Sequence, residues 1–518
     1  MNDEKNRSQM PEWEQEWDVE QILRESRETS AEDPQPPRRE VPRKSQPVRP
    51  VQNRKKKKKG GAGRYLPFVA TLVMLVVCVV GLAVLAIHAF SPGTSATTRP
   101  TGGDDEPVPT PPPTEDVNLK AQELIAEADL LAVGYDYDAA VAKLAEYGSD
   151  WQTNDLLVAA KERLEKERNK LVRWADTTQI THIFFHSLIV DTDRSFDGDY
   201  SSTGYNQYMA TVSEFEKILQ SLYDRGFVLV RIHDIAKLTT NADGEEVYAQ
   251  GDIYLPPGKT PIIISQDDVN YYEYMIDGDG DGQADARGDG FANKIVIGQD
   301  GRLTCEYVTA GGQTVYGDYD LVPILERFIQ QHPDFSYRGA RAIIAVTGYE
   351  GVFGYRTHPK YKETLGQERY EQEVAQAKRV AQQLRDEGWE IASHSFGHPA
   401  YGSISEDAVK TDIQKWEDQV QPIVGDSDIF IYPYGSDIAG VGRYQGEKFD
   451  ALYAAGYRFF CNVDSTKYWV QIRDKYVRQG RRNIDGYRMW WDPDMLDDLF
   501  VVEEVFDKAR PTPVPSVV

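Results

Sequence analysis

The chain has 518 residues, of which 40% are hydrophobic and 27% are charged, so it is long enough to form two or three folded units. Its net charge of −25 is uneven, because residues 1–64 hold 16 Lys and Arg against 12 Asp and Glu, whereas the rest holds 42 against 71. The acidity of this larger part argues against nucleic acid and anionic lipid as its partners. Three cysteines are too few for a disulfide framework.

The N-terminal part predicts a membrane anchor. Residues 1–64 are polar and lack apolar periodicity, which is typical of a disordered tail. Six basic residues at 54–59 precede the uncharged stretch 66–90, which as a helix would be about 37 Å long and could cross a bilayer. We therefore predict a transmembrane helix at 65–90. The basic residues before it place the tail in the cytoplasm and everything after it outside the cell.

Two connecting segments follow the predicted anchor. Residues 91–116 are rich in Pro, Thr, Gly and Asp, which predicts an extended linker. Residues 117–176 show helical periodicity that is interrupted at Gly134, which is typical of one tetratricopeptide-like hairpin, and a charged third helix follows. Because one such unit cannot bury a continuous core alone, we predict a helical stalk packed on the next domain rather than a peptide-binding array.

Residues 177–510 alternate between apolar strand patterns and helical patterns. This alternation predicts a parallel sheet covered by helices, and spacing alone permits either an open sheet or a closed barrel. The predicted strands are 181–190, 227–231, 260–266, 341–347, 388–393, 428–432 and 457–463. The predicted helices are 211–225, 319–331, 366–387, 405–422 and 446–455.

An insertion at about 276–318 interrupts this alternation. Four carboxylates stand at relative positions 1, 3, 5 and 9 with glycine at position 6, which matches a calcium-binding loop. They are Asp277, Asp279, Asp281 and Asp285. Position 12 is Gly288 instead of the usual glutamate, so an acidic turn is the alternative. Residues 295–315 are then predicted to form a small hairpin.

Two short motifs at strand ends predict a metal site. His394 and His398 stand four apart after an apolar run, with glycine and proline beside the second histidine. Another apolar run ends at Asp267 and Asp268, and the carboxyl ends of strands are where open α/β folds place their chemistry. Asp268 and the two histidines would form a three-ligand set for zinc, cobalt or nickel. Asp267 would act as a general base, or alternatively as a helix N-cap.

Strand-Asp-Asp together with His-Ser-x-x-His resembles the polysaccharide deacetylases of carbohydrate esterase family 4, over about residues 181–489. The resemblance implies a distorted (β/α)7 barrel with the same three metal ligands and with Asp267 as the base. It also implies a hydrolase that removes acetyl groups from a polysaccharide containing N-acetylglucosamine, such as an exopolysaccharide or peptidoglycan.

The position of the candidate general acid indicates which branch of the family the chain resembles. An amide leaving group needs a proton, which most of the family supplies from a histidine near the C-terminal end, but no histidine follows His398. His186, in the first predicted strand, resembles the acid of the rearranged branch that deacetylates poly-N-acetylglucosamine. We expect His186 to be the acid, with His182 and His233 as competitors and a buried structural histidine as the alternative.

The segment 429–435 resembles the third motif of the family, in which the N–H of Tyr434 would help to hold the oxyanion. Ile431 replaces the usual arginine, as in the rearranged branch. Arg482 is the candidate for a compensating charge near Asp267, with a surface cation as the alternative.

Two residues beside the aspartate pair depart from the family pattern. Gln266 and Val269 replace an aromatic residue and a glycine, and we expect both to crowd the site.

The leading hypothesis is therefore a membrane-anchored, extracellular, metal-dependent deacetylase, whose acidic surface is compatible with a neutral or cationic glycan. Removal of O-acetyl groups is the nearest alternative, because it needs the same groups. A catalytically inactive glycan-binding or scaffold protein on the same barrel is the alternative from another class. A transmembrane signalling protein with residues 1–64 as its output is a third, and no protein partner is readable.

Overall fold

The computed structural model describes residues 114–516 except 279 and 281–282. The predicted tail at 1–64, the predicted transmembrane helix at 65–90 and nearly all of the linker at 91–116 lie outside these residues. Within the described part, no helix is both long enough and apolar enough to cross a bilayer.

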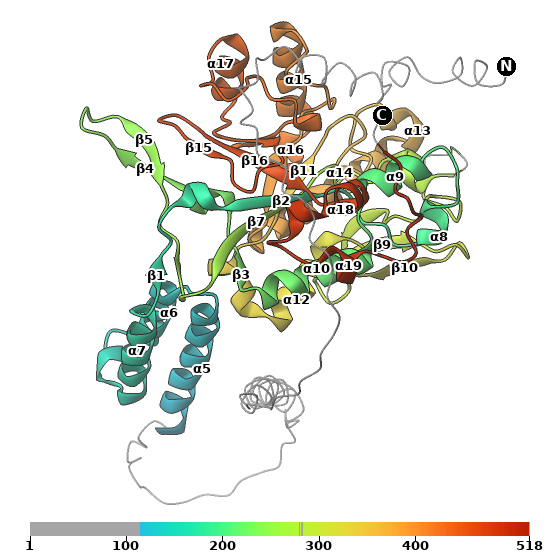
Figure 1. The fold of residues 1–518 in the computed structure, drawn as a ribbon. Helices are drawn as coiled ribbons and strands as arrows, with labels where there is room; N and C mark the ends of the chain where they lie inside the picture. The colour runs from blue at the N-terminus through green and yellow to red at the C-terminus, as the bar shows by residue number, and fades with distance from the viewer. Residues whose placement is uncertain (1–113, 279, 281–282, 517–518) are drawn as a thin grey trace, which may run out of the picture. The chain divides into compact units, whose positions relative to one another are not determined.

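Seven parallel strands form a closed barrel, which confirms the predicted barrel class (Figure 1). The strand order is β11-β12-β13-β14-β16-β2-β7, and the pairing of β7 with β11 closes the ring. In chain order the strands are β2 (Thr181–Phe185), β7 (Thr260–Gln266), β11 (Ile343–Val346), β12 (Glu390–Ser393), β13 (Ile429–Ile431), β14 (Phe459–Val463) and β16 (Val477–Asn483).

One barrel strand differs from the sequence prediction. β3 (Phe227–Leu229) pairs with the first three residues of β7. β11 pairs with the last two residues of β7. β3 therefore lies outside the closed ring, and β16 takes the place between β14 and β2. The sequence of β16 is VRQGRRN, which lacks the apolar pattern of a buried strand and was therefore not predicted. The short β15 (Val470–Ile472) pairs antiparallel with β16.

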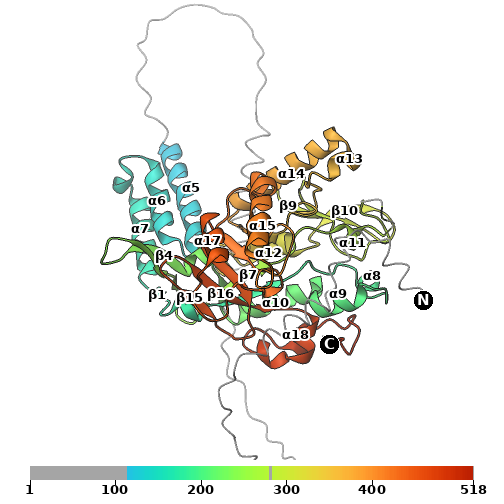
Figure 2. The same ribbon diagram turned by 90° about the horizontal axis from the view of Figure 1, so that it is seen from above.

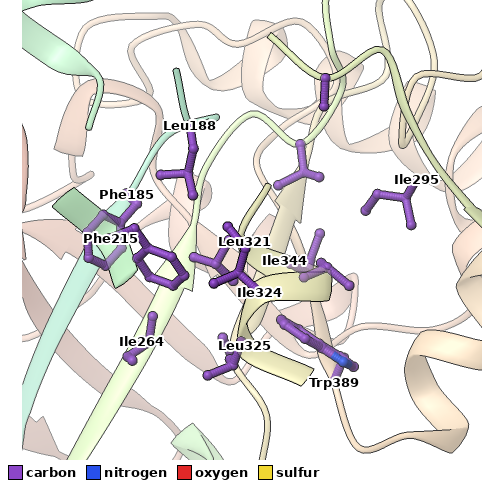
Figure 3. Packing of buried hydrophobic residues seen from close by; sticks show 14 of the residues in the cluster. Phe185, Leu188, Phe215, Ile264, Ile295, Leu321, Ile324, Leu325, Ile344 and Trp389 are labelled. Carbon is purple, nitrogen blue, oxygen red and sulfur yellow. The ribbon is translucent and has the colours of Figure 1, made fainter. Parts of the chain in front are cut away.

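Five longer helices cover the barrel: α10 (Val212–Asp224), α12 (Leu321–Gln331), α14 (Gln367–Asp386), α15 (Glu406–Gln419) and α17 (Glu447–Ala454). Helix α10 begins with a capping box, in which Thr211 Oγ1 accepts from the N–H of Glu214 and Glu214 Oε2 accepts from the N–H of Thr211. Its apolar face packs on the barrel, and the rings of Phe215 and Phe185 meet at 5.0 Å between centroids (Figure 3).

Shorter helices lie in the connecting segments and near the C-terminus. They are α8 (Thr192–Ser195), α9 (Ser202–Tyr208), α11 (Glu273–Ile276), α13 (Tyr361–Leu365), α16 (Gln421–Val424), α18 (Gly486–Trp491) and α19 (Val502–Val505). The insertion contains a three-stranded antiparallel sheet instead of a single hairpin. Its strands are β8 (Lys294–Ile297), β9 (Leu303–Val308) and β10 (Thr314–Gly317).

The barrel interior has an apolar part and a polar part, because alternate residues of each strand point inward. The apolar part comes mainly from β11, β12, β13 and β14, and includes Ile343, Ala345, Ala392, Ile429, Ile431, Phe459 and Cys461. The polar part comes from β2, β7 and β16, and consists of His182, Ser265, Gln479 and Arg481, all of them buried. These three strands are neighbours in the ring.

Three helices precede the barrel and lie side by side (Figures 1 and 2): α5 (Thr114–Val133), α6 (Tyr137–Leu144) and α7 (Asp155–Arg168). Small residues and leucines pack between them, including Ala128, Ala140, Leu144 and Leu157. The turn between α5 and α6 contacts the segment before β11, because Tyr135 Oη donates to the carbonyl of Asp334 and the N–H of Arg338 donates to the carbonyl of Gly134.

Two small antiparallel pairs complete the described chain. β1 (Val172–Arg173) pairs with β6 (Tyr254–Leu255), and β4 (Ala236–Thr240) pairs with β5 (Glu246–Gln250).

Candidate active site

The predicted metal ligands converge at one rim of the barrel. Asp268 follows β7, and His394 and His398 follow β12, so all three lie at the carboxyl ends of strands. Their ligand atoms are all within 4.8 Å of one another. The two Nε2 atoms of the histidines are 3.2 Å apart, and Asp268 Oδ2 is 3.9 Å from His394 Nε2 and 3.7 Å from His398 Nε2.

A second contact orients two of these ligands toward a shared point. His394 Nδ1 donates to the carbonyl of Ile431 at 2.8 Å, which leaves its Nε2 with a free lone pair. Asp268 Oδ1 accepts from Tyr272 Oη at 2.6 Å, which leaves Oδ2 turned to the histidines. One carboxylate and two imidazoles with open positions fit a divalent transition metal, and this donor set suits zinc, cobalt and nickel alike.

The loop that carries both histidines is held by Asp412 of α15. Its carboxylate accepts from the N–H groups of Phe396 and Gly397, both at 2.8 Å. Ser395, His398 and Asp268 all have left-handed backbone conformations, with φ between +58° and +63°. Such conformations cost free energy at residues other than glycine, and they gather at functional sites. Nothing in the sequence around Asp412 distinguishes it from an ordinary helix residue.

The neighbouring charges favour the metal-binding protonation states. Burial would raise the pKa of Asp268, but the imidazoles of His398, His394 and His186 outweigh it and lower that pKa below its ordinary value. Burial lowers the pKa of His398 to about 4. Asp268 is therefore a carboxylate and His398 a neutral imidazole near neutral pH, which are the forms that bind a cation.

The candidate base, Asp267, is paired with a buried arginine. Arg481 donates from Nη1 to Asp267 Oδ1 at 2.6 Å and from Nη2 to Oδ2 at 2.9 Å. Burial would raise the pKa of Asp267, but Arg481 lowers it to about 2. Asp267 is therefore ionised at neutral pH, and each of its oxygens keeps a lone pair for a further proton.

The prediction that Arg482 lies near Asp267 is wrong. Its guanidinium donates to Thr181 Oγ1 and to the carboxylate of Asp498. Successive residues of a strand point to opposite faces, so β16 turns Arg481 into the barrel and Arg482 out of it. Sequence reasoning missed Arg481 because the segment 477–483 was not predicted as a strand.

His186 lies at the same rim as the metal ligands. It follows β2 and is half-buried, and its Nδ1 donates to the carbonyl of Tyr208 at 3.1 Å, which leaves Nε2 available. Burial raises the pKa of three nearby carboxyls, and the imidazole of His186 acts in the opposite direction and lowers it. These carboxyls are Asp267, Asp268 and Asp485. The predicted acid, base and metal ligands therefore all lie at the carboxyl ends of barrel strands, at the same rim.

The two competing histidines lie elsewhere. His182 is buried inside the barrel, where its ring nitrogens contact Ser265 and Gln479. His233 contacts Asp428 and Glu390 at the amino ends of β13 and β12, opposite the rim that carries the metal ligands. Neither position reaches the metal ligands.

Tyr434 follows β13 and packs beside the metal ligands. Its ring lies 4.5 Å from that of His398 between centroids, at an interplanar angle of 73°, and 37% of its surface is exposed. Its φ of +57° turns the chain over the rim. The contribution of its N–H to an oxyanion site stays a prediction.

The expectation that Gln266 and Val269 crowd the site is wrong. Gln266 Nε2 donates to the carbonyl of His186 at 3.2 Å and to Asp320 Oδ1 at 2.8 Å, so its side chain supports the segment that carries the candidate acid. Val269 is fully buried in the main hydrophobic cluster, among the residues between the barrel and its helices.

The predicted calcium loop is only partly described. Asp277 Oδ1 accepts from the N–H of Gly280, and Asp285 Oδ1 accepts from the N–H groups of Gly278, Arg287 and Gly288. These two carboxylates hold turns. Asp279 and Asp281 lie outside the described residues, so calcium binding stays a prediction.

Residues 365–460 match the family model described as polysaccharide deacetylase. Over these residues the chain is similar to the polysaccharide deacetylases. The matched segment includes His394, His398 and Tyr434. The predicted resemblance to polysaccharide deacetylases, and with it the predicted enzyme class, a deacetylase that hydrolyses its substrate, are confirmed over this segment. No curated protein sequence matches this chain.

Two solved structures resemble this chain at low identity. The Streptococcus pyogenes deacetylase PplD in complex with acetate is 13% identical, over 64% of this chain and 99% of that one, with a TM-score of 0.32. A family 4 carbohydrate esterase from Streptomyces lividans in complex with acetate is 14% identical, over 32% of this chain and 74% of that one, with a TM-score of 0.18. The fold assignment rests on the strand order described above.

Proposed function

We propose that this polysaccharide deacetylase is metal-dependent and removes N-acetyl groups from a polymer that contains N-acetylglucosamine. The observation that carries the proposal is the placement of Asp268, His394 and His398 beside the ionised, arginine-paired Asp267 at one rim of the barrel. A ligand set with open positions next to an unprotonated carboxylate is the arrangement that hydrolysis of an amide needs.

Each residue has a role in the proposed hydrolysis. A bound divalent cation would polarise the acetyl carbonyl and make water more acidic. Asp267 would accept the proton of the attacking water, while Arg481 keeps this carboxylate ionised and fixed in direction. His186 would act as an imidazolium, whose Nδ1 proton is held by the carbonyl of Tyr208 and whose Nε2 proton would pass to the leaving amine.

The proposal also includes the rearranged branch and a location outside the cell. The candidate acid, His186, directly follows the first barrel strand, no histidine follows His398, and Ile431 stands where the family usually has arginine. These features support the branch that acts on poly-N-acetylglucosamine. The uncharged stretch 66–90 with the basic residues 54–59 before it supports a single-pass membrane anchor with the catalytic domain outside.

The test measures the metal content of the purified full chain and acetate release from an N-acetylglucosamine oligomer. We expect a bound transition metal in the wild type and loss of acetate release after chelation. Asp267→Asn should lower kcat about 100-fold or more with the metal retained, because general-base catalysis typically contributes 10²–10⁴. His394→Ala should lose the metal.

The matched control is His233→Gln, which replaces a histidine at the opposite end of the barrel and should leave kcat unchanged. A metal-free wild type that releases acetate would contradict metal dependence. Binding of the oligomer without acetate release would support the scaffold function instead. Release from an O-acetylated oligosaccharide alone would support O-deacetylation.

A further inference from the structure

A chain of hydrogen-bonded side chains runs through the barrel interior beneath Asp267. Its members come from the neighbouring strands β2, β7 and β16, and each is at most 3% exposed: Asp267, Arg481, Ser265, His182 and Gln479. The apolar interior opposite them needs no such pairing of donors with acceptors. The proposed reaction uses Asp267 and Arg481 but gives no role to the other three.

The contacts join these side chains end to end. Arg481 Nη1, which binds Asp267, also donates to Ser265 Oγ at 3.2 Å. Ser265 Oγ is 2.9 Å from His182 Nε2. His182 Nδ1 is 3.0 Å from Gln479 Oε1, and Gln479 Nε2 donates to the carbonyl of Ile180 at 3.1 Å.

The two ends fix the direction of every hydrogen bond. The carbonyl of Ile180 can only accept, so Gln479 turns its NH₂ to this carbonyl and its oxygen to His182. His182 must then carry its proton on Nδ1. Its Nε2 accepts from the hydroxyl of Ser265, and this hydroxyl oxygen accepts from Arg481, which can only donate. Burial and the nearby Arg481 lower the pKa of His182 well below its ordinary value, in agreement with a neutral ring.

We propose that His182 and Ser265 are positioning residues that hold the Arg481 guanidinium in the plane of the Asp267 carboxylate. This inference rests on the proposed function, in which Asp267 is the base. A guanidinium can rotate about its long side chain, and the Ser265 hydroxyl gives Nη1 a second acceptor that limits this rotation. The His182 ring in turn fixes the Ser265 hydroxyl, because it accepts the hydroxyl proton.

Two other contacts hold Arg481 and set the expected size of the effect. Its Nε donates to the carbonyl of Asn462 at 3.4 Å, and its guanidinium lies 4.2 Å from the centre of the Phe184 ring. Loss of the Ser265 contact should therefore loosen Arg481 without releasing it. Because a misplacement of about 1 Å can cost about 100-fold in rate, we expect a partial loss of about tenfold in kcat.

The experiment compares His182→Leu, Ser265→Ala and His182→Gln in the metal-loaded full chain, with acetate release from an N-acetylglucosamine oligomer as the assay. We expect kcat to fall about tenfold in the first two variants, with KM, metal content and thermal midpoint close to wild type. His182→Gln should recover most of the rate, because an amide can accept from Ser265 and donate to Gln479. His233→Gln is the matched histidine control and should keep its full rate.

A double-mutant cycle separates positioning from general damage to the barrel. In an Arg481→Met background, the proposal expects His182→Leu to cause no further loss of kcat, since its effect passes through Arg481. A full additional tenfold loss would overturn the proposal. An unchanged kcat in His182→Leu, or a loss that only follows the metal content, would also overturn it.

If the proposed deacetylase function is wrong, the wild type itself releases no acetate, and this result differs from every outcome above. In that case a crystal structure of His182→Leu decides the positioning. Displacement of Arg481 from Asp267 would support the proposal, and an unchanged ion pair would overturn it.

Discussion

At the scale of single residues, neighbours in sequence have different roles. Arg481 and Arg482 are adjacent, yet one guanidinium binds the candidate base inside the barrel and the other binds Asp498 outside it. The same holds for Asp267 and Asp268, because β7 ends at Gln266 and the left-handed backbone of Asp268 turns its carboxylate to the histidines. Composition alone cannot distinguish such neighbours, because strand parity and strand ends decide which way each side chain points.

The two arginines give a residue-scale prediction. Arg481→Met should lower kcat for acetate release about 100-fold, because the candidate base loses both of its fixed hydrogen bonds. Arg482→Met removes the partly buried ion pair with Asp498, so it should lower the unfolding free energy. It should change kcat by less than about threefold, because Arg482 does not contact the candidate base. Denaturant unfolding and steady-state kinetics of the two full-length variants check this, and equal losses of kcat would contradict it.

At the scale of elements, helix α15 and the ends of the strands place the ligands. Asp412 belongs to α15, the helix that follows the histidine loop, and its carboxylate accepts from two N–H groups of that loop. At the other end of the barrel, His233 joins the first residue of β12 to the residue before β13, through Glu390 and Asp428. The first contact ties the histidine loop to the helix that follows it, and the second ties together segments more than 150 residues apart.

Asp412 gives an element-scale prediction for metal affinity. Asp412→Ala should weaken metal binding by about 10–100-fold, because residues that orient the ligands typically contribute that much. Asp407→Ala, on the exposed face of the same helix, is the matched control and should bind the metal as the wild type does. Metal titration by calorimetry measures both, and an unchanged affinity in Asp412→Ala would show that the loop holds its conformation without this carboxylate.

His233 gives a prediction about pH and stability. Burial lowers the pKa of His233, but its hydrogen bonds to Asp428 and Glu390 outweigh this and raise the pKa to about 10. A raised pKa means that the stabilisation is complete below the ordinary histidine pKa of about 6.5 and is lost as pH rises toward 10. The unfolding free energy of the wild type should therefore exceed that of His233→Gln most near pH 6. Urea unfolding should show the difference shrinking by pH 10, whereas a constant difference would contradict the assignment.

At the scale of the whole molecule, the candidate site joins segments that lie far apart in the chain. Asp268 follows β7, the histidines follow β12, His186 follows β2, and Arg481 lies in β16. They meet because parallel strands of one closed ring all end at the same rim. The ligand set exists only when the ring is closed, so metal binding is coupled to folding of the barrel.

This coupling predicts the effect of metal removal on stability. A metal that binds only the native state at 100 times its Kd stabilises it by about 2.7 kcal/mol, so a chelator should lower the thermal midpoint by several degrees. His394→Ala should show no further decrease with chelator, because its ligand set is already incomplete. Differential scanning calorimetry with and without chelator measures both, and equal shifts in the two proteins would point to metal bound elsewhere.

The sequence by itself determined the elements with strong local patterns. Strands such as 260–266 and helices such as 366–387 were predictable because their apolar residues are contiguous or regularly spaced. The metal ligands were predictable for a similar reason, since Asp267 and Asp268 are adjacent and the two histidines stand four apart. His186 could be placed at the site because it lies in the first predicted strand and resembles the acid of the rearranged branch.

Only the tertiary structure decided which of two neighbours faces the site and which strand completes the ring. β16 is polar because its inward residues meet Asp267, Ser265 and His182, so its sequence does not show the apolar pattern of a buried strand. Gln266 points away from the site because Asp320 lies outside the barrel to accept from it. The direction of these side chains depends on pairing between segments more than 50 residues apart, and local sequence patterns carry no information about such pairing.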